Sequence, residues 1–319
     1  MDLDLRLVRY FVVVADELHF GRAAARLHIS QPALSKQIRR LESDLGFRLL
    51  TRDSRHVALT PDGARFLRDA RVLIAHATRM TRAEDAGIRI AHIFDLDTSR
   101  LVVDAFAARF PDVAVIASSM DSQRQLDALM NGLLDVAILR VTPGMTAAHP
   151  EGWRHRPLRL EPFRLVGRRG ERECATVSLN ERPIEVFGDP RGSALFNAHG
   201  EYLSAFESDA ALTLSWLGNP GTFDQCLARM ERAPAGAYLL EFDSYAQRYR
   251  RFGMPLHHPA ELQPVYPWSI AWRDEPLSAA TAAFLAVAAD VAAERRWLEP
   301  DTSAPLWQPP SAEAVRTLR

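Results

Sequence analysis

The sequence contains only two cysteines, Cys174 and Cys226, among its 319 residues. Two widely separated cysteines supply neither a disulfide framework nor the closely spaced ligands of a zinc knuckle. We therefore expect both to be small buried apolar residues, with a redox switch as the alternative.

Long apolar stretches and a secretory start are also lacking. The longest apolar stretch, 279–293, is interrupted by a threonine and an aspartate and falls short of the roughly 20 residues that a membrane-spanning helix needs. The chain begins with acidic residues where a secretory signal carries positive charge ahead of an apolar run. The sequence therefore predicts a cytoplasmic protein without a membrane partner.

The common motifs of enzymes are missing as well. The ten histidines form no H-E-x-x-H, and there is no G-x-S-x-G elbow, no G-x-x-x-x-G-K-[ST] loop and no G-x-G-x-x-G after the first predicted strand. His257 and His258 are adjacent, so their side chains project in different directions, and we treat them as surface residues and not as metal ligands. The sequence predicts no catalytic residues, no cofactor and no metal, and hence a protein that is not an enzyme.

Basic residues are concentrated at the front of the chain. Residues 1–87 contain 15 Lys and Arg against 11 Asp and Glu, whereas the whole chain has a formal net charge of −1. This surplus suits an N-terminal segment that contacts a polyanion. With 47% hydrophobic and 25% charged residues the chain has the composition of a folded protein, and its length predicts two or three domains.

The first 60 residues show the pattern of three helices followed by a short hairpin. Apolar residues at helical spacing predict a helix from Leu5, and an Ala-rich helix at 22–27 breaks at His28. Ser30 then precedes the pair Gln31–Pro32, which is the arrangement of an N-cap before a proline in the first helical turn. The third helix is therefore expected to begin at Gln31.

This third predicted helix has two different faces, and Gly46 offers its stop. The apolar face comprises Leu34, Ile38 and Leu41, and the polar residues off that face are Ser35, Lys36, Arg39 and Arg40. The polar face is free to contact a partner. In the following segment, 49–60, basic residues between short apolar runs predict a two-stranded wing, closed by Thr60 as the N-cap of the next helix.

A long helix and an α/β body are predicted beyond the wing. Apolar spacing extends over 61–86, and because such a helix has few neighbours in its own domain we expect it to pair with its copy in a second chain. From Ile88 onward apolar strands alternate with helices, which indicates a parallel sheet covered on both faces. Crossing strands at 163–166 and 268–272 divide this body into two hinged lobes with a cleft between them.

The segment FGRAAARLHISQPALSKQIRRLESDLGFRLLTRDSRHVALTPDGARFL resembles, nearly position by position, the winged helix-turn-helix of LysR-type transcriptional regulators. Weaker similarities to that family are FPDVAVIASSMDSQRQLDALMNGLLDVAIL and WRDEPLSAATAAFL. The resemblance implies an α+β multidomain protein. Its expected parts are an N-terminal winged helix-turn-helix DNA-binding domain at 1–60, a long linker and dimerisation helix with a hinge at 61–87, and a C-terminal two-lobed α/β, periplasmic-binding-protein-like effector domain at 88–298.

Within the effector domain we expect lobe I at about 88–162 and 268–298 and lobe II at about 163–267. The last segment, 299–319, contains four prolines and lacks periodicity. The sequence therefore predicts a disordered tail there.

The resemblance also implies how the protein contacts DNA. A major groove admits a helix and presents distinguishable base edges, so the helix 31–44 is expected to enter it. Gln31, together with Ser35 or Arg39, is expected to approach base edges. The full set of expected DNA contacts is Arg22, Ser30, Gln31, Pro32, Ser35, Lys36, Arg39, Arg52 and Arg55.

The remaining members of that set are expected to fix the position on the backbone. Arg22, Ser30 and Lys36 are placed on phosphates. Arg52 and Arg55 of the wing are expected to reach the backbone or the adjoining minor groove, whose width a guanidinium can sense.

In the family a small molecule binds between the lobes, often an anion held at helix N-termini. The pocket residues that the resemblance implies are Phe94, Thr98, Ser122, Arg140, Phe187 and Thr222. The first loop, however, carries Asp95 and Asp97 where the family often offers a hydroxyl, and two carboxylates repel an anion. Either they point outward as helix caps, or the effector is neutral or cationic.

The second lobe also departs from the family pattern, with Pro234 in a turn and Glu241 where a strand commonly ends in proline. A regulator with a degenerate cleft and no effector is therefore one alternative. A solute-binding protein is another, disfavoured by the missing signal peptide and the basic front, and a DNA-architectural protein without sequence preference is a third.

The sequence as a whole predicts a LysR-type DNA-binding transcriptional regulator whose C-terminal cleft senses a small molecule. The expected partners are double-stranded DNA, a second copy of the chain in a homodimer or homotetramer, a small-molecule effector and RNA polymerase.

Overall fold

The computed structural model describes residues 3–52, 57–81, 87–93, 96–193, 195–219, 221–232, 236–302 and 304–309. The chain divides near residue 84 into two compact units, and each unit has hydrophobic core clusters of its own. None of the helices in the described ranges is both long and apolar enough to span a membrane.

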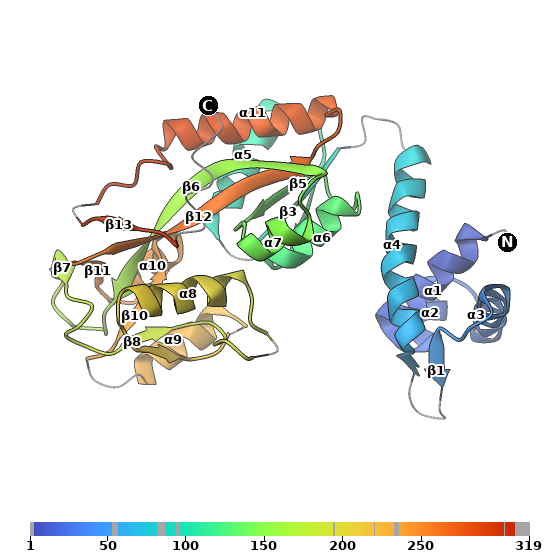
Figure 1. Ribbon diagram of the computed structural model, residues 1–319, viewed down its shortest axis with the longest axis horizontal. Helices are drawn as coiled ribbons and strands as arrows, with labels where there is room; N and C mark the ends of the chain where they lie inside the picture. The colour runs from blue at the N-terminus through green and yellow to red at the C-terminus, as the bar shows by residue number, and fades with distance from the viewer. Residues whose placement is uncertain are drawn as a thin grey trace. The chain divides into compact units, whose positions relative to one another are not determined.

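Within its described residues, the N-terminal unit is made of helices and a two-stranded antiparallel wing (Figure 1). Its elements are α1 Leu5–Glu17, α2 Phe20–Arg26, α3 Gln31–Leu45, β1 Leu50–Arg52, β2 Val57–Leu59 and α4 Pro61–Thr81. The apolar faces of α1, α2 and α3 meet in one core, in which Phe11 and Ile38 are fully buried. The predicted winged helix-turn-helix is confirmed.

Local signals fix both ends of α3. The Ser30 hydroxyl accepts the N–H of the third residue after it at 3.3 Å. Pro32 lies in the first turn, where backbone N–H groups have no acceptor within the helix, so its lack of an N–H breaks no helical hydrogen bond. At the other end Gly46 adopts a left-handed conformation with a φ of 79°, which glycine enters at little cost. The Glu42 carboxylate accepts the N–H groups of residues 49 and 50, at 2.9 and 3.1 Å, so the end of α3 also positions the wing.

The first half of α4 belongs to the core of the N-terminal unit. Thr60 caps the helix as predicted, because its hydroxyl accepts the N–H of the third helical residue at 2.8 Å. The Phe66 ring lies 5.5 Å from that of Phe11, and Leu67 is only 8% exposed. The expectation that this helix has few neighbours in its own domain is therefore wrong for this half. Leu73, further along, is 37% exposed.

The C-terminal unit, in its described residues, is built on one mixed sheet that runs through two lobes (Figure 1). The strands are β3 Ile88–His92, β4 Val115–Ser119, β5 Val136–Leu139, β6 Trp153–Val166, β7 Thr176–Val177, β8 Ile184–Val186, β9 Leu214–Trp216, β10 Tyr238–Phe242, β11 Leu256–Pro259, β12 Gln263–Arg273 and β13 Leu306–Trp307. The main order is β4-β3-β5-β12-β6-β10-β8-β9. The strands β3 to β5 are mutually parallel, as are β8 to β10. The two long crossing strands β6 and β12 run antiparallel to each other, and β12 is antiparallel to β5 and β6 to β10. The predicted all-parallel sheet is thus mixed.

Helices cover both faces of the sheet in each lobe. They are α5 Asp97–Arg109, α6 Ser122–Met130, α7 Pro143–Ala148, α8 Ala198–Asp209, α9 Phe223–Arg232, α10 Asp243–Arg250 and α11 Ala279–Glu294. In lobe I, α5 and α11 share one face, where the rings of Phe106 and Phe284 lie 5.1 Å apart, and α6 packs on the other. In lobe II, α8 packs on one face, and α9 and α10 pack on the other.

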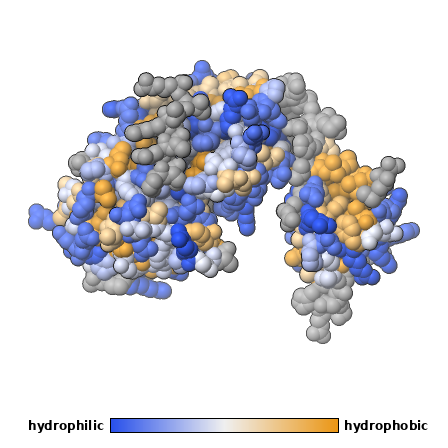
Figure 2. Space-filling model, viewed as in Figure 1, coloured by the Kyte–Doolittle hydropathy of each residue, from blue (hydrophilic) through white to orange (hydrophobic). Residues whose placement is uncertain are grey.

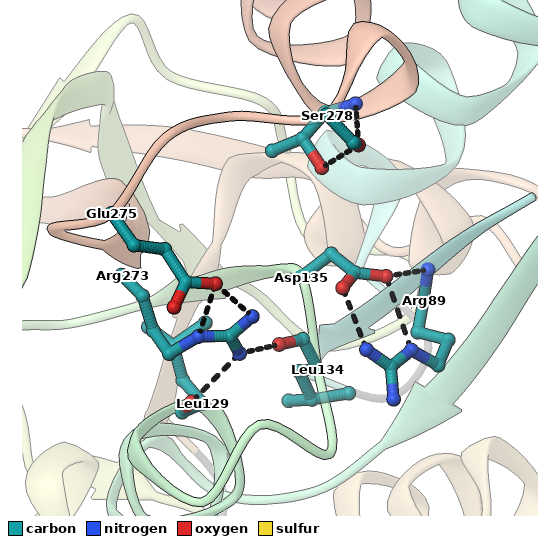
Figure 3. A network of polar contacts seen from close by, with 8 residues as sticks. Arg89, Leu129, Leu134, Asp135, Arg273, Glu275 and Ser278 are labelled. Atoms are coloured by element: carbon teal, nitrogen blue, oxygen red, sulfur yellow. Dashed lines mark hydrogen bonds and ion pairs between the residues drawn. The ribbon is translucent and has the colours of Figure 1, made fainter. Parts of the chain in front are cut away.

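Two arginines fasten the strands and helices of lobe I (Figure 3). On β3, Arg89 forms a two-pronged pair with Asp135, in which Nη2 and Nε lie 2.7 and 3.1 Å from the two carboxylate oxygens. At the end of β12, Arg273 donates to the carbonyl of Leu129 in the last turn of α6 at 3.1 Å and is held by Glu275. A cation thus satisfies a helix-end carbonyl and anchors α6 to the sheet.

The segment after α11 folds back onto lobe II. Strand β13 pairs with β12, and the buried Trp307 ring lies 4.9 Å from the Phe206 ring while its indole N–H donates to Asp209 at 3.3 Å. The predicted disordered tail at 299–319 is therefore wrong for residues 304–309, because one large aromatic side chain anchors a segment that shows no periodicity. Residues 310–319 lie outside the described residues.

Two expectations about single residues also need correction. Cys226 is buried as expected, but Cys174 is exposed. His257, treated as a surface residue, is buried, and its Nδ1 lies 2.9 Å from the carbonyl oxygen and 3.1 Å from the amide nitrogen of Cys174. In the part of the chain that the structure describes, no three His, Cys, Asp or Glu side chains are grouped to hold a metal ion.

Candidate nucleic-acid interface and effector cavity

The helix α3 presents a polar surface above a buried apolar face. Leu34, Ile38 and Leu41 are fully buried in the core of the N-terminal unit, so helical periodicity turns Lys36 outward, where it is exposed. Gln31 continues the spacing of the apolar face, but it is exposed in the first turn of the helix. Among the described residues, none forms a hydrogen bond or ion pair with the Lys36 ammonium group. The helix therefore offers an exposed amide at its first turn and, on its outer side, an exposed cation that has no partner among the described residues.

Other predicted DNA contacts flank this surface. Ser35 is partly buried, and Arg39 is exposed with its Nε–H donating to the Ser35 carbonyl at 3.3 Å. Arg22 on α2 is exposed, but its Nε lies 3.3 Å from a carboxylate oxygen of Glu17, so part of its charge is already compensated. The sequence alone did not indicate this pairing.

Some predicted positions cannot be placed. The backbone of Arg52 belongs to β1, but its side chain lies outside the described residues, as does the whole of Arg55. Phe94 and Asp95 also lie outside the described residues.

A cavity of about 450 Å³ opens between the two lobes of the C-terminal unit. Lobe I contributes the residues between β4 and α6, and lobe II contributes the loop after β8 and the starts of α8 and α9. Strand β12 adds the rings of Tyr266 and Trp268. Three of the predicted pocket residues, Ser122, Phe187 and Thr222, line this cavity.

Arg140, a further predicted pocket residue, is not in the cavity lining. Its side chain is 2% exposed, Nη1 donates to the carbonyl of Ala198 at 2.6 Å, and Nη2 lies 3.5 Å from the carboxylate of Glu201. Arg140 follows β5 in lobe I, whereas both partners are on α8 in lobe II. The guanidinium therefore joins the two lobes behind the cavity wall, 5.8 Å from the centre of the Tyr266 ring, and its role in the pocket stays a prediction.

Thr98 does not line the cavity either. Its hydroxyl accepts a hydrogen bond from Nη1 of Arg159 at 2.9 Å, and Asp97 pairs with the same guanidinium. The N-cap position of α5 is Leu96, which offers no side-chain cap. The expectation that Asp97 is an outward helix cap is therefore wrong, because Leu96 holds the cap position and the Asp97 carboxylate pairs with the guanidinium of Arg159.

A buried ionic network at the lobe crossing escaped sequence analysis. Glu161 on β6 is fully buried, 3.5 Å from Arg159, and accepts the Trp268 indole N–H at 2.7 Å and the Ser244 N–H at 3.2 Å. Burial raises the pKa of Glu161, and the Arg159 charge opposes that shift. The network links both crossing strands to the start of α10.

Glu241 and His199 are cavity residues that were not predicted as such. Burial raises the pKa of Glu241 to about 8, the Glu161 charge adds to the shift, and the hydrogen bond from the Phe242 N–H opposes it. Burial lowers the pKa of His199 to about 4, so its imidazole is neutral near pH 7. Its Nε2 lies 3.2 Å from the Phe187 carbonyl. The sequence feature that could have identified Glu241 as a cavity residue is the presence of a carboxyl group within an otherwise apolar strand.

Comparison with known proteins follows the same division of the chain. Residues 5–64 match the family model "Bacterial regulatory helix-turn-helix protein, lysR family", and residues 88–182 match "LysR substrate binding domain". The transcriptional regulator TfdT of Cupriavidus pinatubonensis is 38% identical over 199 residues, which cover 60% of this chain and 86% of TfdT. The chain belongs to the LysR family of transcriptional regulators.

Other LysR-family relatives are matched over a shorter stretch. YnfL of Escherichia coli is 42% identical over 173 residues, or 51% of this chain and 57% of YnfL, and AlsR of Bacillus subtilis is 36% identical over 47% of this chain and 52% of AlsR. The chain thus spans about half the length of several curated relatives. Their family consists of transcriptional regulators and not of enzymes.

Solved LysR-family structures share the fold. The regulator CbnR has a TM-score of 0.68 at 24% identity, covering 90% of this chain and 99% of CbnR, and CbnR complexed with its target DNA has a TM-score of 0.67. Full-length BenM covers 94% of this chain with a TM-score of 0.55 at 22% identity.

Proposed function

We propose that this chain is a transcriptional regulator that binds double-stranded DNA through α3 and the wing and senses a small molecule between its two lobes. The observation that carries the proposal is α3 itself, a capped helix with its apolar face buried and its polar face exposed. It lies inside the segment that matches the helix-turn-helix model of the family. A helix of this kind fits a major groove, where base edges differ in their donors and acceptors.

Five of the predicted contact residues in α3 and its N-cap have proposed roles. Gln31, with Ser35 or Arg39, hydrogen-bonds base edges, because an amide offers both a donor and an acceptor. Lys36 contacts a phosphate as a point charge, and Ser30 fixes the register on the backbone.

Binding to the DNA upstream of its own gene, measured at several salt concentrations, tests these roles. Lys36→Ala is expected to weaken binding to every sequence and to reduce the salt slope by about one unit, because one fewer phosphate is neutralised. Gln31→Ala is expected to relax base preference at one position. Arg100→Ala, which removes an exposed cation from α5, is the matched control. An unchanged salt slope for Lys36→Ala would refute the phosphate contact, and failure of the unaltered chain to bind at low salt would refute the function.

A homodimer is part of the proposal, because a symmetric pair of helices reads two half-sites. Figure 2 shows hydrophobic residues gathered on the N-terminal unit where α4 and α1 lie. Leu5 and Leu73, on those two helices, are each 37% exposed. An exposed apolar patch of this kind is typical of a protein interface. The homotetramer, the contact with RNA polymerase and the cytoplasmic location stay predictions.

The cavity supports the sensing role over the alternative of a degenerate cleft. Its volume of about 450 Å³ lies in the range of small-molecule sites, and both lobes contribute to its lining. A ligand that contacts both lobes favours one lobe arrangement over another in proportion to its difference in affinity. The Arg140 contact with α8 is the element of lobe closure that such a ligand would reinforce.

A further inference from the structure

No arginine or lysine is among the described residues that line the cavity between the lobes. The lining includes three carboxyl groups, those of Asp121, Asp189 and Glu241, and the buried His199 is neutral near pH 7. The Arg140 guanidinium lies behind the lining, 5.8 Å from the centre of the Tyr266 ring, and is held by the Ala198 carbonyl and by Glu201 of α8. An anion that leaves water for such a cavity would lose its hydration without direct contact with a cation of the described lining, and the nearby Arg140 already has partners on α8, so a carboxylate or phosphate ligand is disfavoured.

The helix N-termini at the cavity are already capped by the chain's own side chains. Asp121 accepts the Arg124 N–H at 3.0 Å at the start of α6, and Asn197 accepts two N–H groups of α8 at 2.9 and 3.2 Å. Thr222 accepts the Gln225 N–H at 3.4 Å in α9. A helix N-terminus attracts anions through N–H groups that lack a partner, and each of these caps satisfies one or two of those groups.

Glu241 is the most buried of the three carboxyl groups, at 9% exposed. Its Oε1 accepts the Phe242 N–H at 2.9 Å, and burial raises its pKa to about 8, so near pH 7 the carboxyl group keeps its proton. A cation placed beside it would favour the ionised form. Glu241 is therefore suited to act as a counter-ion that is charged when a cation is bound and neutral in its absence.

Aromatic rings form much of the remaining wall. Phe242, Tyr245, Tyr266 and Trp268 line the cavity, and the Trp268 ring lies 4.7 Å from Tyr266 and 5.9 Å from Phe242. The faces of tryptophan and tyrosine rings attract cations, and their area also buries apolar groups. The wall and the carboxyl group therefore favour the same ligand chemistry.

We propose that the cavity binds a small organic cation, an amine attached to an apolar or aromatic body, with Glu241 as its counter-ion. This rests on the proposed function, in which the same cavity is the effector site. It departs from anion binding, because the described lining contains three carboxyl groups and no arginine or lysine, and side chains of the protein already cap the nearby helix N-termini.

Three probes of similar shape and different charge test the proposal: 2-phenylethylamine, 2-phenylethanol and phenylacetate, each titrated into the full chain. Trp268 lines the cavity, so tryptophan fluorescence and the unfolding temperature both report occupancy. The amine is expected to bind at least about tenfold more tightly than the alcohol. Phenylacetate is expected to bind more weakly than both the amine and the alcohol.

Two variants locate the charge preference. Glu241→Gln keeps the shape and an acceptor for the Phe242 N–H but removes the charge, so it is expected to lower the affinity for the amine about tenfold and to leave that for the alcohol unchanged. Glu185→Gln is the matched control, because it removes another buried carboxyl group, on the neighbouring strand β8 and outside the cavity lining. It is expected to keep the affinity for the amine. The unfolding temperature of each variant without probe shows that it folds.

Absence of binding by the amine, binding of phenylacetate as tight as that of the amine, or an affinity for the amine that Glu241→Gln leaves unchanged would each overturn the proposal. DNA binding, measured on the same preparations without probe, tests the proposed function separately. If the chain does not bind DNA but still prefers the amine, the proposed DNA-binding function is refuted and the cation site is not. If the chain binds DNA but does not prefer the amine, only the cation site is refuted.

Discussion

Replacing Glu241 by glutamine is expected to stabilise the C-terminal unit, and to do so more strongly as the pH rises. The substitution keeps the volume of the side chain and leaves an oxygen to accept the Phe242 N–H, which Oε1 of Glu241 accepts at 2.9 Å. The substitution removes the ability of the side chain to ionise, and burial disfavours the ionised carboxylate. The change in stability therefore reports the titration of this carboxyl group.

The sign and size follow from the shifted pKa. Burial raises the pKa of Glu241 from its ordinary 4.5 to about 8 in the folded chain. Between these two pKa values the unfolded chain releases the proton of Glu241 and the folded chain keeps it. The folding stability of the unaltered protein is therefore unaffected by this group below the lower pKa, and it falls as the pH rises towards the upper pKa. One pH unit in this window corresponds to about 1.4 kcal/mol, so the advantage of Glu241→Gln should grow by about 2 kcal/mol between about pH 6 and about pH 7.5.

Tryptophan fluorescence is the appropriate assay, because all six tryptophans lie beyond residue 152, in the C-terminal unit. For a unit of this size about 2 kcal/mol corresponds to a difference of roughly 4–8 °C in unfolding temperature. Histidines with lowered pKa, including His155 and His258, titrate in both proteins and cancel in the difference. Glu294→Gln, which removes an exposed carboxyl group from α11, is the control.

An advantage of Glu241→Gln that is the same at both pH values would refute the reasoning. It would mean that the carboxyl group of Glu241 titrates alike in the folded and unfolded chains. Glu161 and Arg248 act on Glu241 with opposite signs, so their effect changes the midpoint of the window and not its direction.

Four further substitutions test other parts of the structure. Ser30→Ala removes the N-cap of α3 and should lower the free energy of unfolding of the N-terminal unit by about 1 kcal/mol, measured by circular dichroism in urea; an unchanged midpoint would show that the cap contributes nothing. Trp307→Ala removes the aromatic anchor of β13 and should destabilise the C-terminal unit by about 3 kcal/mol, measured by thermal unfolding; an unchanged unfolding temperature would mean that this strand is not docked in solution. Leu73→Glu should give monomers by light scattering without loss of helix content, and dimers that survive it would place the interface elsewhere. Leu67→Glu is expected instead to unfold the N-terminal unit, since Leu67 is buried in its core.

Local signals in the sequence determined the N-terminal unit almost completely. The signals at the two ends of α3 each act within one helical turn: Ser30 with the pair Gln31–Pro32 at the start, and Gly46 at the end. The position of α3 could therefore be predicted from these residues. The helix 61–81 and the alternation of strands and helices from Ile88 follow from the spacing of apolar residues, which is also a local property. Burial on one face of a helix leaves a periodic pattern even when the partner is unknown.

The tertiary structure alone decided which side chains meet in the cavity. Ser122 and Thr222 stand about 100 residues apart in the sequence and come together because β6 and β12 carry the chain between the lobes. Arg140 matched a pocket position by resemblance, yet its guanidinium is held by α8, while Glu241, a departure from the family pattern, faces the cavity. The direction of a side chain and the charges around it depend on packing between distant segments, and no local periodicity encodes that packing.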